Sequence, residues 1–93
     1  MNVPIIHNPS ENRFEYRNAN DIAVCDYKVI GNMWYFNHTS VPDSMRGQGV
    51  AAQLVETALT YVDEQHGRVV ANCSYVAAYI KKNPNFAHLV AIE

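Results

Sequence analysis

Long apolar runs are missing from this 93-residue chain, and so is an excess of charge of either sign. A membrane-spanning helix needs roughly 20 consecutive apolar residues, and no stretch of the chain approaches that length. Lys and Arg number 7 against 9 Asp and Glu, a formal net charge of −2. Nucleic acids and anionic membranes both select a basic surface. We therefore expect neither as a partner.

Residues 1–8 lack the basic start and the long apolar centre of a secretory signal. This absence predicts a cytoplasmic protein. Cysteine is also scarce, with only Cys25 and Cys73, and no CxxC, HExxH or clustered Cys/His spacing occurs. No metal site is therefore predicted. In a reducing cytoplasm the two cysteines are expected to be free thiols rather than a disulfide.

The length of the chain predicts that residues 1–93 form a single domain with one small core. Its first half carries strand patterns, because short apolar or alternating segments are separated by turn residues. Gly31-Asn32 is typical of a tight hairpin loop. The strand after this loop begins with aromatic residues on both faces, which predicts a central strand covered on both sides. The predicted strands cover residues 5–7, 13–17, 22–30 and 33–41.

The pattern changes after Pro42. From Val50 the apolar residues recur at helical spacing, and Gly67 is the expected stop of this helix. A short apolar strand, residues 69–71, follows and should run parallel to strand 33–41 because a helix connects the two. Ser74 is placed to cap a second helix over residues 75–82. The predicted order is β-β-β-β-α-β-α, with residues 85–93 left as a short helix or strand.

The turn at residues 46–51, Arg-Gly-Gln-Gly-Val-Ala, carries the strongest chemical signal. Its two glycines allow a sharp turn and leave no side chain to block a ligand. The helix that follows offers unpaired N–H groups and a partial positive charge, and Arg46 adds a full one. Together these features favour a pyrophosphate, although neither the Walker A nor the GxGxxG pattern is present. The alternative is a plain glycine-rich turn from a strand into a helix.

Three segments together carry a family resemblance. Arg46, Gly49 and Ala51 fit the R/Q-x-x-G-x-G/A signature of the GNAT acyltransferases, and residues 38–42 and 73–79 extend the similarity. The chain resembles small single-domain GNAT-like N-acetyltransferases, a group that includes the YjdJ-like bacterial proteins, over residues 14–86. The resemblance implies an α+β, reduced GNAT fold, with a mixed, mostly antiparallel sheet and two main helices.

The same resemblance implies an acetyl-CoA or other acyl-CoA co-substrate and acetyl transfer to an unidentified amine. The backbone at Val41 would lie beside the pantetheine arm, and the last strand would splay away to open the slot for the thioester. The pyrophosphate of coenzyme A would be held by Arg46, Gly47, Gln48, Gly49, Val50 and Ala51. The chain lacks the helices and strands that shape the acceptor pocket of full-length members. A non-catalytic module that binds or senses CoA is therefore the alternative function.

Cys73 and His38 are candidate catalytic residues with competing structural roles. A thiol at a helix N-terminus is favoured as thiolate, and the small GNAT-like proteins carry a cysteine at this place. Cys73 is thus a candidate to take the acyl group or to assist proton transfer, or else it is a small buried apolar residue. His38 is a candidate base for the amine, or a hydrogen-bonded residue that pins the loop. Cys25 is expected to belong to the core.

Tyr79 completes the candidate set. The resemblance implies that this phenol protonates the departing CoA thiolate, and a group with a pKa near 10 can donate that proton. The alternative is core packing, since Tyr75, Val76, Tyr79 and Ile80 share one predicted helical stripe. The sequence does not identify the acceptor, the length of the acyl chain or the oligomeric state. It is compatible with a monomer.

Overall fold

The computed structural model describes residues 4–91, which form one five-stranded sheet with two α-helices. The element order matches the predicted β-β-β-β-α-β-α, and the mixed α+β fold is confirmed. Short 3₁₀ turns occupy Pro9–Glu11, Asp43–Met45 and Pro84–Leu89. The regular elements are β1 (Ile6–Asn8), β2 (Arg13–Arg17), β3 (Ile22–Ile30), β4 (Met33–Ser40), α1 (Val50–Glu64), β5 (Arg68–Ala71) and α2 (Ser74–Lys82).

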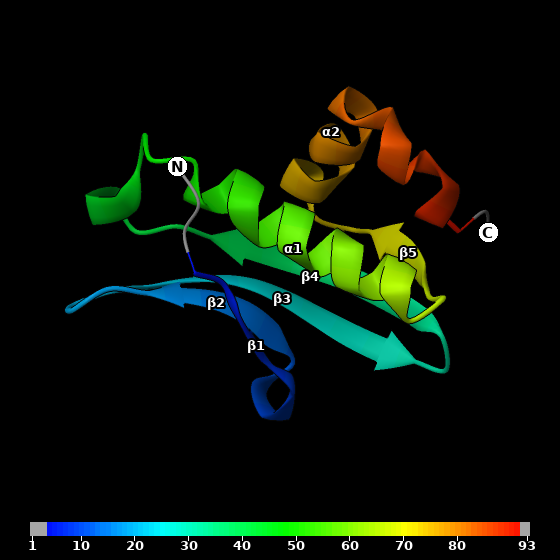
Figure 1. The fold of residues 1–93 in the computed structure, drawn as a ribbon, viewed down its shortest axis with the longest axis horizontal. Coiled ribbons are helices and arrows are strands. Elements are labelled where there is room, and N and C mark those ends of the chain that lie inside the picture. The colour runs from blue at the N-terminus through cyan, green and yellow to red at the C-terminus, as the bar shows by residue number, and fades with distance from the viewer. Residues whose placement is uncertain (1–3, 92–93) are drawn as a thin grey trace.

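The strands lie in the order β1-β2-β3-β4-β5, so that β4 is flanked by β3 and β5. The first three pairings are antiparallel, and β5 is parallel to β4, as its helical connection predicted. Both helices lie on one side of the sheet (Figure 1). The expectation that β4 is covered on both sides is therefore wrong. Trp34 and Phe36 face the helices and are buried, whereas Tyr35 on the other face is only half-buried.

The core lies between the sheet and α1. The apolar stripe of this helix is almost fully buried. Each valine or leucine in it contributes about 1.5–3 kcal/mol to the free energy of folding. Cys25 is fully buried in the same cluster, which confirms its expected core position. No helix among residues 4–91 is both long and apolar enough to cross a membrane. The buried residues of α1 are Val50, Leu54, Val55, Ala58, Leu59 and Val62.

The end of α1 differs from the sequence-based expectation. The left-handed residue after the helix is His66, with φ 59°, and not Gly67. Gly67 follows it and donates its N–H to the carbonyl of Val62 at 2.9 Å, which together with the His66 N–H to the carbonyl of Asp63 closes the helix end. Gly67 also packs against an indole ring. A Cβ at this position would lie 2.8 Å from Nε1 of Trp34. Close packing on Trp34, rather than helix termination, is what requires glycine here.

Residues 85–93 were predicted to form either a short helix or a strand, and their described part contains a 3₁₀ helix and a short β-bridge. A 3₁₀ helix over Pro84–Leu89 is followed by a parallel bridge between Val90 and Val69. The Ala91 N–H donates to the carbonyl of Val69 at 2.8 Å. This short pairing covers part of the outer edge of β5. Residues 1–3 and 92–93, which belong to the predicted N-terminal and C-terminal segments, lie outside the described residues.

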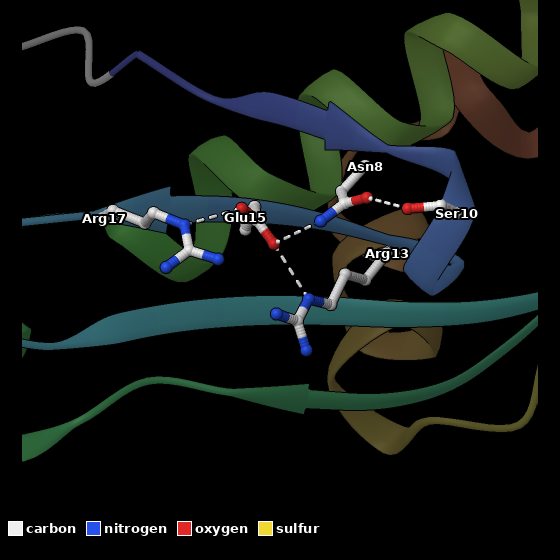
Figure 2. A network of polar contacts seen from close by, with 5 residues as sticks. All are labelled: Asn8, Ser10, Arg13, Glu15 and Arg17. Carbon is white, nitrogen blue, oxygen red and sulfur yellow. Dashed lines mark hydrogen bonds and ion pairs between the residues drawn. The ribbon is translucent and has the colours of Figure 1, made fainter.

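A buried carboxylate ties β1 to β2 on the face of the sheet opposite the helices (Figure 2). Glu15 is 3% exposed and accepts hydrogen bonds from Nε of Arg13 and Nε of Arg17, both at 2.8 Å. Asn8 of β1 adds a third donor at 3.3 Å. Burial alone would raise the pKa of Glu15, but these donors outweigh it and lower the pKa to about 2. The carboxylate is therefore ionised at neutral pH.

An irregularity in β4 changes which side chains face the helices. Tyr27 of β3 pairs with Phe36, but the preceding Asp26 pairs with His38. Asn37 is therefore the extra residue of a β-bulge, and a bulge of one residue inverts the inward and outward alternation beyond it. Before the bulge the even-numbered residues of β4 point inward. After it Thr39 points inward, and His38 is exposed on the opposite face.

Candidate functional site

The glycine turn lies between β4 and α1. Its entrance is anchored by Met45, which is 1% exposed. Gly47 and Gly49 have φ values of +80° and +74°, a conformation that side chains disfavour. A Cβ on either glycine would meet no atom within 4 Å. Backbone conformation, and not lack of space, is therefore the reason for glycine, and the open side of the turn is accessible to a ligand.

The first turn of α1 presents unpaired backbone donors. The first helical hydrogen bond runs from the N–H of Gln53 to the carbonyl of Gly49 at 3.1 Å. The N–H groups of Val50, Ala51 and Ala52 precede this bond and have no acceptor within the helix. No side chain caps the helix, and its first turn contains no acidic residue. This end of α1 has the geometry and the partial positive charge that suit an anion.

A cavity of about 190 Å³ adjoins the turn. Tyr75 of α2 forms its opposite wall, and Tyr75 is 39% exposed. The stripe assigned to α2 from sequence is thus only partly a core stripe, because Val76 and Ile80 are buried and Tyr75 is not. The remaining lining residues are Val41, Met45, Arg46, Gly47, Gly49, Val50, Ala51 and Ala52.

Two polar side chains of the turn are held locally. Nε of Arg46 lies 3.0 Å from a carboxylate oxygen of Asp43, and both side chains are largely exposed. An exposed ion pair of this kind contributes little to stability. Gln48 donates through Nε2 to the carbonyl of Ser44 at 3.3 Å. Arg46 therefore stays beside the turn with its remaining guanidinium donors available.

Strand β4 continues toward the turn past the end of β5. All four residues of β5 pair with β4, so the splay implied by the resemblance stays a prediction. Their parallel pairing runs from Met33 with Arg68 to Phe36 with Ala71. Beyond it the N–H of Cys73 donates to the carbonyl of Phe36 at 2.9 Å. The backbone of β4 after the bulge has no β5 partner in this pairing. An open strand edge therefore leads from the bulge to the glycine turn.

Cys73 lies two residues beyond the end of β5 and occupies the N-cap position of α2, so the cap predicted at Ser74 is wrong and Ser74 is the first helical residue. It is half-buried, and its Sγ donates to Oγ1 of Thr39 at 3.5 Å. Burial alone would raise the pKa of Cys73, but Thr39 and the amides of Tyr75 and Val76 favour the thiolate and lower the pKa overall. The protonated thiol itself makes no capping hydrogen bond. The side chain thus combines access with a lowered pKa, the two conditions for reactivity.

Cys25 is a free thiol of the opposite character. It is fully buried, and Oγ1 of Thr39 donates to its sulfur at 3.8 Å. Burial raises the pKa of Cys25 to about 12 despite this hydrogen bond. Of the two cysteines, Cys73 alone combines access with a lowered pKa.

The structure does not bring all three candidate catalytic residues together. His38 is exposed on the face of β4 that points away from Cys73. Tyr79 is half-buried on α2, with its ring centroid 6.2 Å from that of Phe86. Burial, Glu56 and Tyr75 raise the pKa of Tyr79, so its phenol is protonated at neutral pH. Tyr79 thus has the protonation state of a proton donor.

Sequence reasoning missed two residues of this site, Thr39 and Tyr75. Thr39 touches both cysteines only because the bulge turns it inward. Tyr75 reaches the cavity because α2 begins beside the glycine turn. Both placements depend on how separate elements meet. The sequence carries no local signal for either.

The family profile described as GCN5-related N-acetyltransferase matches residues 13–89. The chain therefore belongs to the GCN5-related N-acetyltransferase family, and the resemblance drawn from its residues is confirmed. The match spans β2 to the end of the last 3₁₀ helix, including the glycine turn and both cysteines.

The chain is also similar to curated relatives and to a solved structure of GCN5-like description. Protein NATD1 of Xenopus tropicalis is 32% identical over 85 residues, covering 88% of this chain and 78% of the relative. Protein NATD1 of Homo sapiens is 33% identical over 85 residues, with 88% and 75% covered. The solution structure of a GCN5-like protein from Staphylococcus aureus superimposes with a TM-score of 0.75 at 25% identity, covering 99% of this chain and 92% of that one. The narrower YjdJ-like grouping stays a prediction.

Proposed function

We propose that this protein binds acetyl-CoA and transfers its acetyl group to an amine. The observation that carries the proposal is the left-handed Gly47 and Gly49 turn, which leaves the first-turn amides of α1 without helical acceptors. These amides lie at the end of an open strand edge with a half-buried thiol beside it. The arrangement suits a long, anionic thioester such as acetyl-CoA.

The binding roles follow from position. The pyrophosphate is assigned to the turn from Arg46 to Ala51, where amide donors and one guanidinium face solvent. The pantetheine arm is assigned to the free edge of β4 and to Val41, which directly follows it, because the backbone groups there are available for strand-like pairing. Tyr75 would close the other side of the cavity. These residues include every cofactor-binding position predicted from the sequence.

Transfer has two possible routes in this site. In the covalent route the Cys73 thiolate attacks the thioester carbonyl, CoA leaves as thiolate, and Tyr79 supplies its proton. The amine then attacks the acetyl-Cys73 carbonyl, its proton passes to the Tyr79 phenolate, and cleavage of the C–S bond restores the Cys73 thiolate. In the direct route the amine attacks the bound thioester itself, and the rate gain comes from holding the two reactants together. His38 keeps its proposed role as a base only for an amine approaching from the outer face of β4.

A non-catalytic module that binds or senses CoA is the second candidate function. Among residues 4–91, only a three-residue 3₁₀ turn joins β1 to β2, and no α-helix is inserted between these strands. The short connection leaves few residues to line a pocket for the acceptor. We retain a single domain in the cytoplasm as part of either proposal.

Thermal unfolding with and without coenzyme A tests binding, since a ligand selective for the folded state raises Tm. We expect a rise for the natural chain and none for Gly49→Val. The matched control is Gly31→Val, because Gly31 has a similar φ of +62° and equally open surroundings in a distant hairpin. Gly31→Val should be destabilised as much as Gly49→Val but should still show the rise in Tm with coenzyme A. No rise at millimolar coenzyme A in the natural chain would contradict both candidate functions.

Intact-mass measurement after incubation with acetyl-CoA separates the two routes of transfer. An acetyl adduct that is absent in Cys73→Ala supports the covalent route. An adduct that persists in that variant would remove Cys73 from the mechanism. Steady-state kinetics with an amine identified by screening gives an independent result. Parallel double-reciprocal lines indicate an acetyl-enzyme, and intersecting lines indicate a ternary complex.

A further inference from the structure

The hydroxyl of Thr39 lies between the two sulfur atoms of the protein. Sγ of Cys73 donates to Oγ1 of Thr39 at 3.5 Å, and Oγ1 donates in turn to Sγ of Cys25 at 3.8 Å. Both distances suit hydrogen bonds to sulfur, which is larger than oxygen. The three side chains come from α2, β4 and β3, so the chain of hydrogen bonds runs from the half-buried site into the core.

The direction of this chain must reverse when Cys73 loses its proton. A thiolate accepts hydrogen bonds and cannot donate them, whereas a threonine hydroxyl both donates one and accepts. Thr39 can therefore turn its proton from Cys25 to Cys73. The S–H of Cys25 is then free to donate to the oxygen of Thr39. Every group keeps a partner in both states, which avoids the cost of an unsatisfied buried donor.

We propose that Thr39 is the positioning residue of the Cys73 thiolate, acting through this reversal, with Cys25 as the terminal donor. Cys25 suits that role because it is fully buried and stays protonated throughout the pH range in which Cys73 ionises. The use of the thiolate in acetyl transfer rests on the proposed function. The reversal itself requires no acetyl-CoA.

The other groups around the thiol divide into two kinds. The amides of Tyr75 and Val76 on α2, and the backbone amide of Thr39 itself, also favour the thiolate. Removal of the Thr39 hydroxyl alone should therefore weaken the effect and not abolish it. The neighbouring titratable groups are the Tyr75 phenol on α2, and Asp26 of β3 and His38 of β4, which pair with each other on the outer face. Asp26 and His38 lie across the sheet from the thiol, and the Tyr75 phenol carries no positive charge, so none of the three replaces Thr39 as the source of stabilisation.

The experiment measures the rate of alkylation of Cys73 by iodoacetamide as a function of pH, followed by intact mass with peptide mapping. We expect Thr39→Val to move the midpoint of the profile upward and to slow alkylation at pH 7 by about tenfold, the change that one unit of pKa produces. Thr39→Ser keeps the hydroxyl and should restore the natural profile. An unchanged midpoint in Thr39→Val, or no rescue by Thr39→Ser, would overturn the proposal.

Cys25→Ala gives a second, independent result if Thr39→Val does not fold. This variant removes the terminal donor and should raise the midpoint by less than Thr39→Val does, whereas Cys25→Ser should leave it near the natural value. Equal midpoints in Cys25→Ala and the natural chain would also contradict the reversal. Thermal shifts with coenzyme A on the same proteins separate the two proposals. If coenzyme A raises Tm normally but Thr39→Val leaves the alkylation profile unaltered, only the positioning role is rejected. If coenzyme A does not raise Tm but Thr39→Val moves the profile, only acetyl-CoA binding is rejected.

Discussion

Cys25 of β3 lies opposite Thr39 of β4. Thr39 is one residue later in β4 than the partner that the register near the hairpin loop would give to Cys25. The pairs from the hairpin loop up to Tyr27 with Phe36 follow a constant register, which if continued would set His38 opposite Cys25. The bulge at Asn37 breaks that register. A threonine therefore meets the two thiols, and a histidine is turned to solvent on the other face.

Replacing His38 tests whether His38 and Thr39 lie on opposite faces of β4. We expect His38→Ala to leave the alkylation midpoint of Cys73 unchanged, because the sheet separates the two side chains. Alkylation by iodoacetamide across pH, as for the Thr39 variants, is the measurement. A shift comparable to that of Thr39→Val would mean that His38 reaches the thiol after all. Any loss of transfer rate with an unchanged midpoint would instead support His38 as the base for the amine.

Removing the negative charge beside Arg46 should strengthen CoA binding. Asp43 pairs with Arg46 at 3.0 Å and places a carboxylate next to the proposed pyrophosphate site. We expect Asp43→Asn to lower the Kd for coenzyme A by about twofold to fivefold, the scale of an exposed ion-pair effect. Titration calorimetry at low and high salt measures it. Arg46→Ala should weaken binding and reduce its salt dependence, and equal affinity in both variants would contradict the assignment.

Gly67→Ala should destabilise the fold by about 1–3 kcal/mol, the usual cost of overpacking. The added Cβ would lie 2.8 Å from Nε1 of Trp34, and the ring is held in the core. Urea unfolding gives the free-energy change. The double variant with Trp34→Phe is the control, because a smaller ring relieves the contact. If the two substitutions act additively, the cost of Gly67→Ala has another origin.

Glu15 should make stability depend on pH in the acid range. Its folded pKa of about 2 lies below the ordinary value of 4.5, so its stabilisation is present above pH 4.5 and is lost as pH falls toward 2. Glu15→Gln should cost about 1.5–3 kcal/mol at pH 7, the scale of hydrogen bonds to a charged group. The free energy of unfolding of this variant should also change less between pH 4.5 and pH 2 than that of the natural chain. Urea unfolding at a series of pH values measures both, and parallel curves would contradict this role of Glu15.

Elements with strong local signals could be predicted closely. The alternation of residues 13–17, the Gly31-Asn32 loop and the helical spacing from Val50 each encode their structure within a few neighbouring residues. The parallel placement of β5 followed from its helical connection alone. The amide-rich start of α1 was predictable for the same reason, since two glycines before a helix act locally.

Features that depend on packing between elements could not be predicted. The stop of α1 was assigned to Gly67, but His66 takes the left-handed conformation and Gly67 serves contact with Trp34. The aromatic residues of β4 suggested two covered faces, but both helices pack on one. In each case the residue type was informative. The partner that explains it lies on a different element.

The order of elements, the family and the glycine turn before α1 could be predicted from the linear chain, because hydrophobic period, turn residues and a short signature are local properties. Which side chain meets Cys73 was settled by the tertiary structure. One extra residue in β4 exchanges inward and outward positions, and that exchange is set by pairing with β3 rather than by the residues themselves. Thr39 thereby joins the thiols, and His38 leaves them.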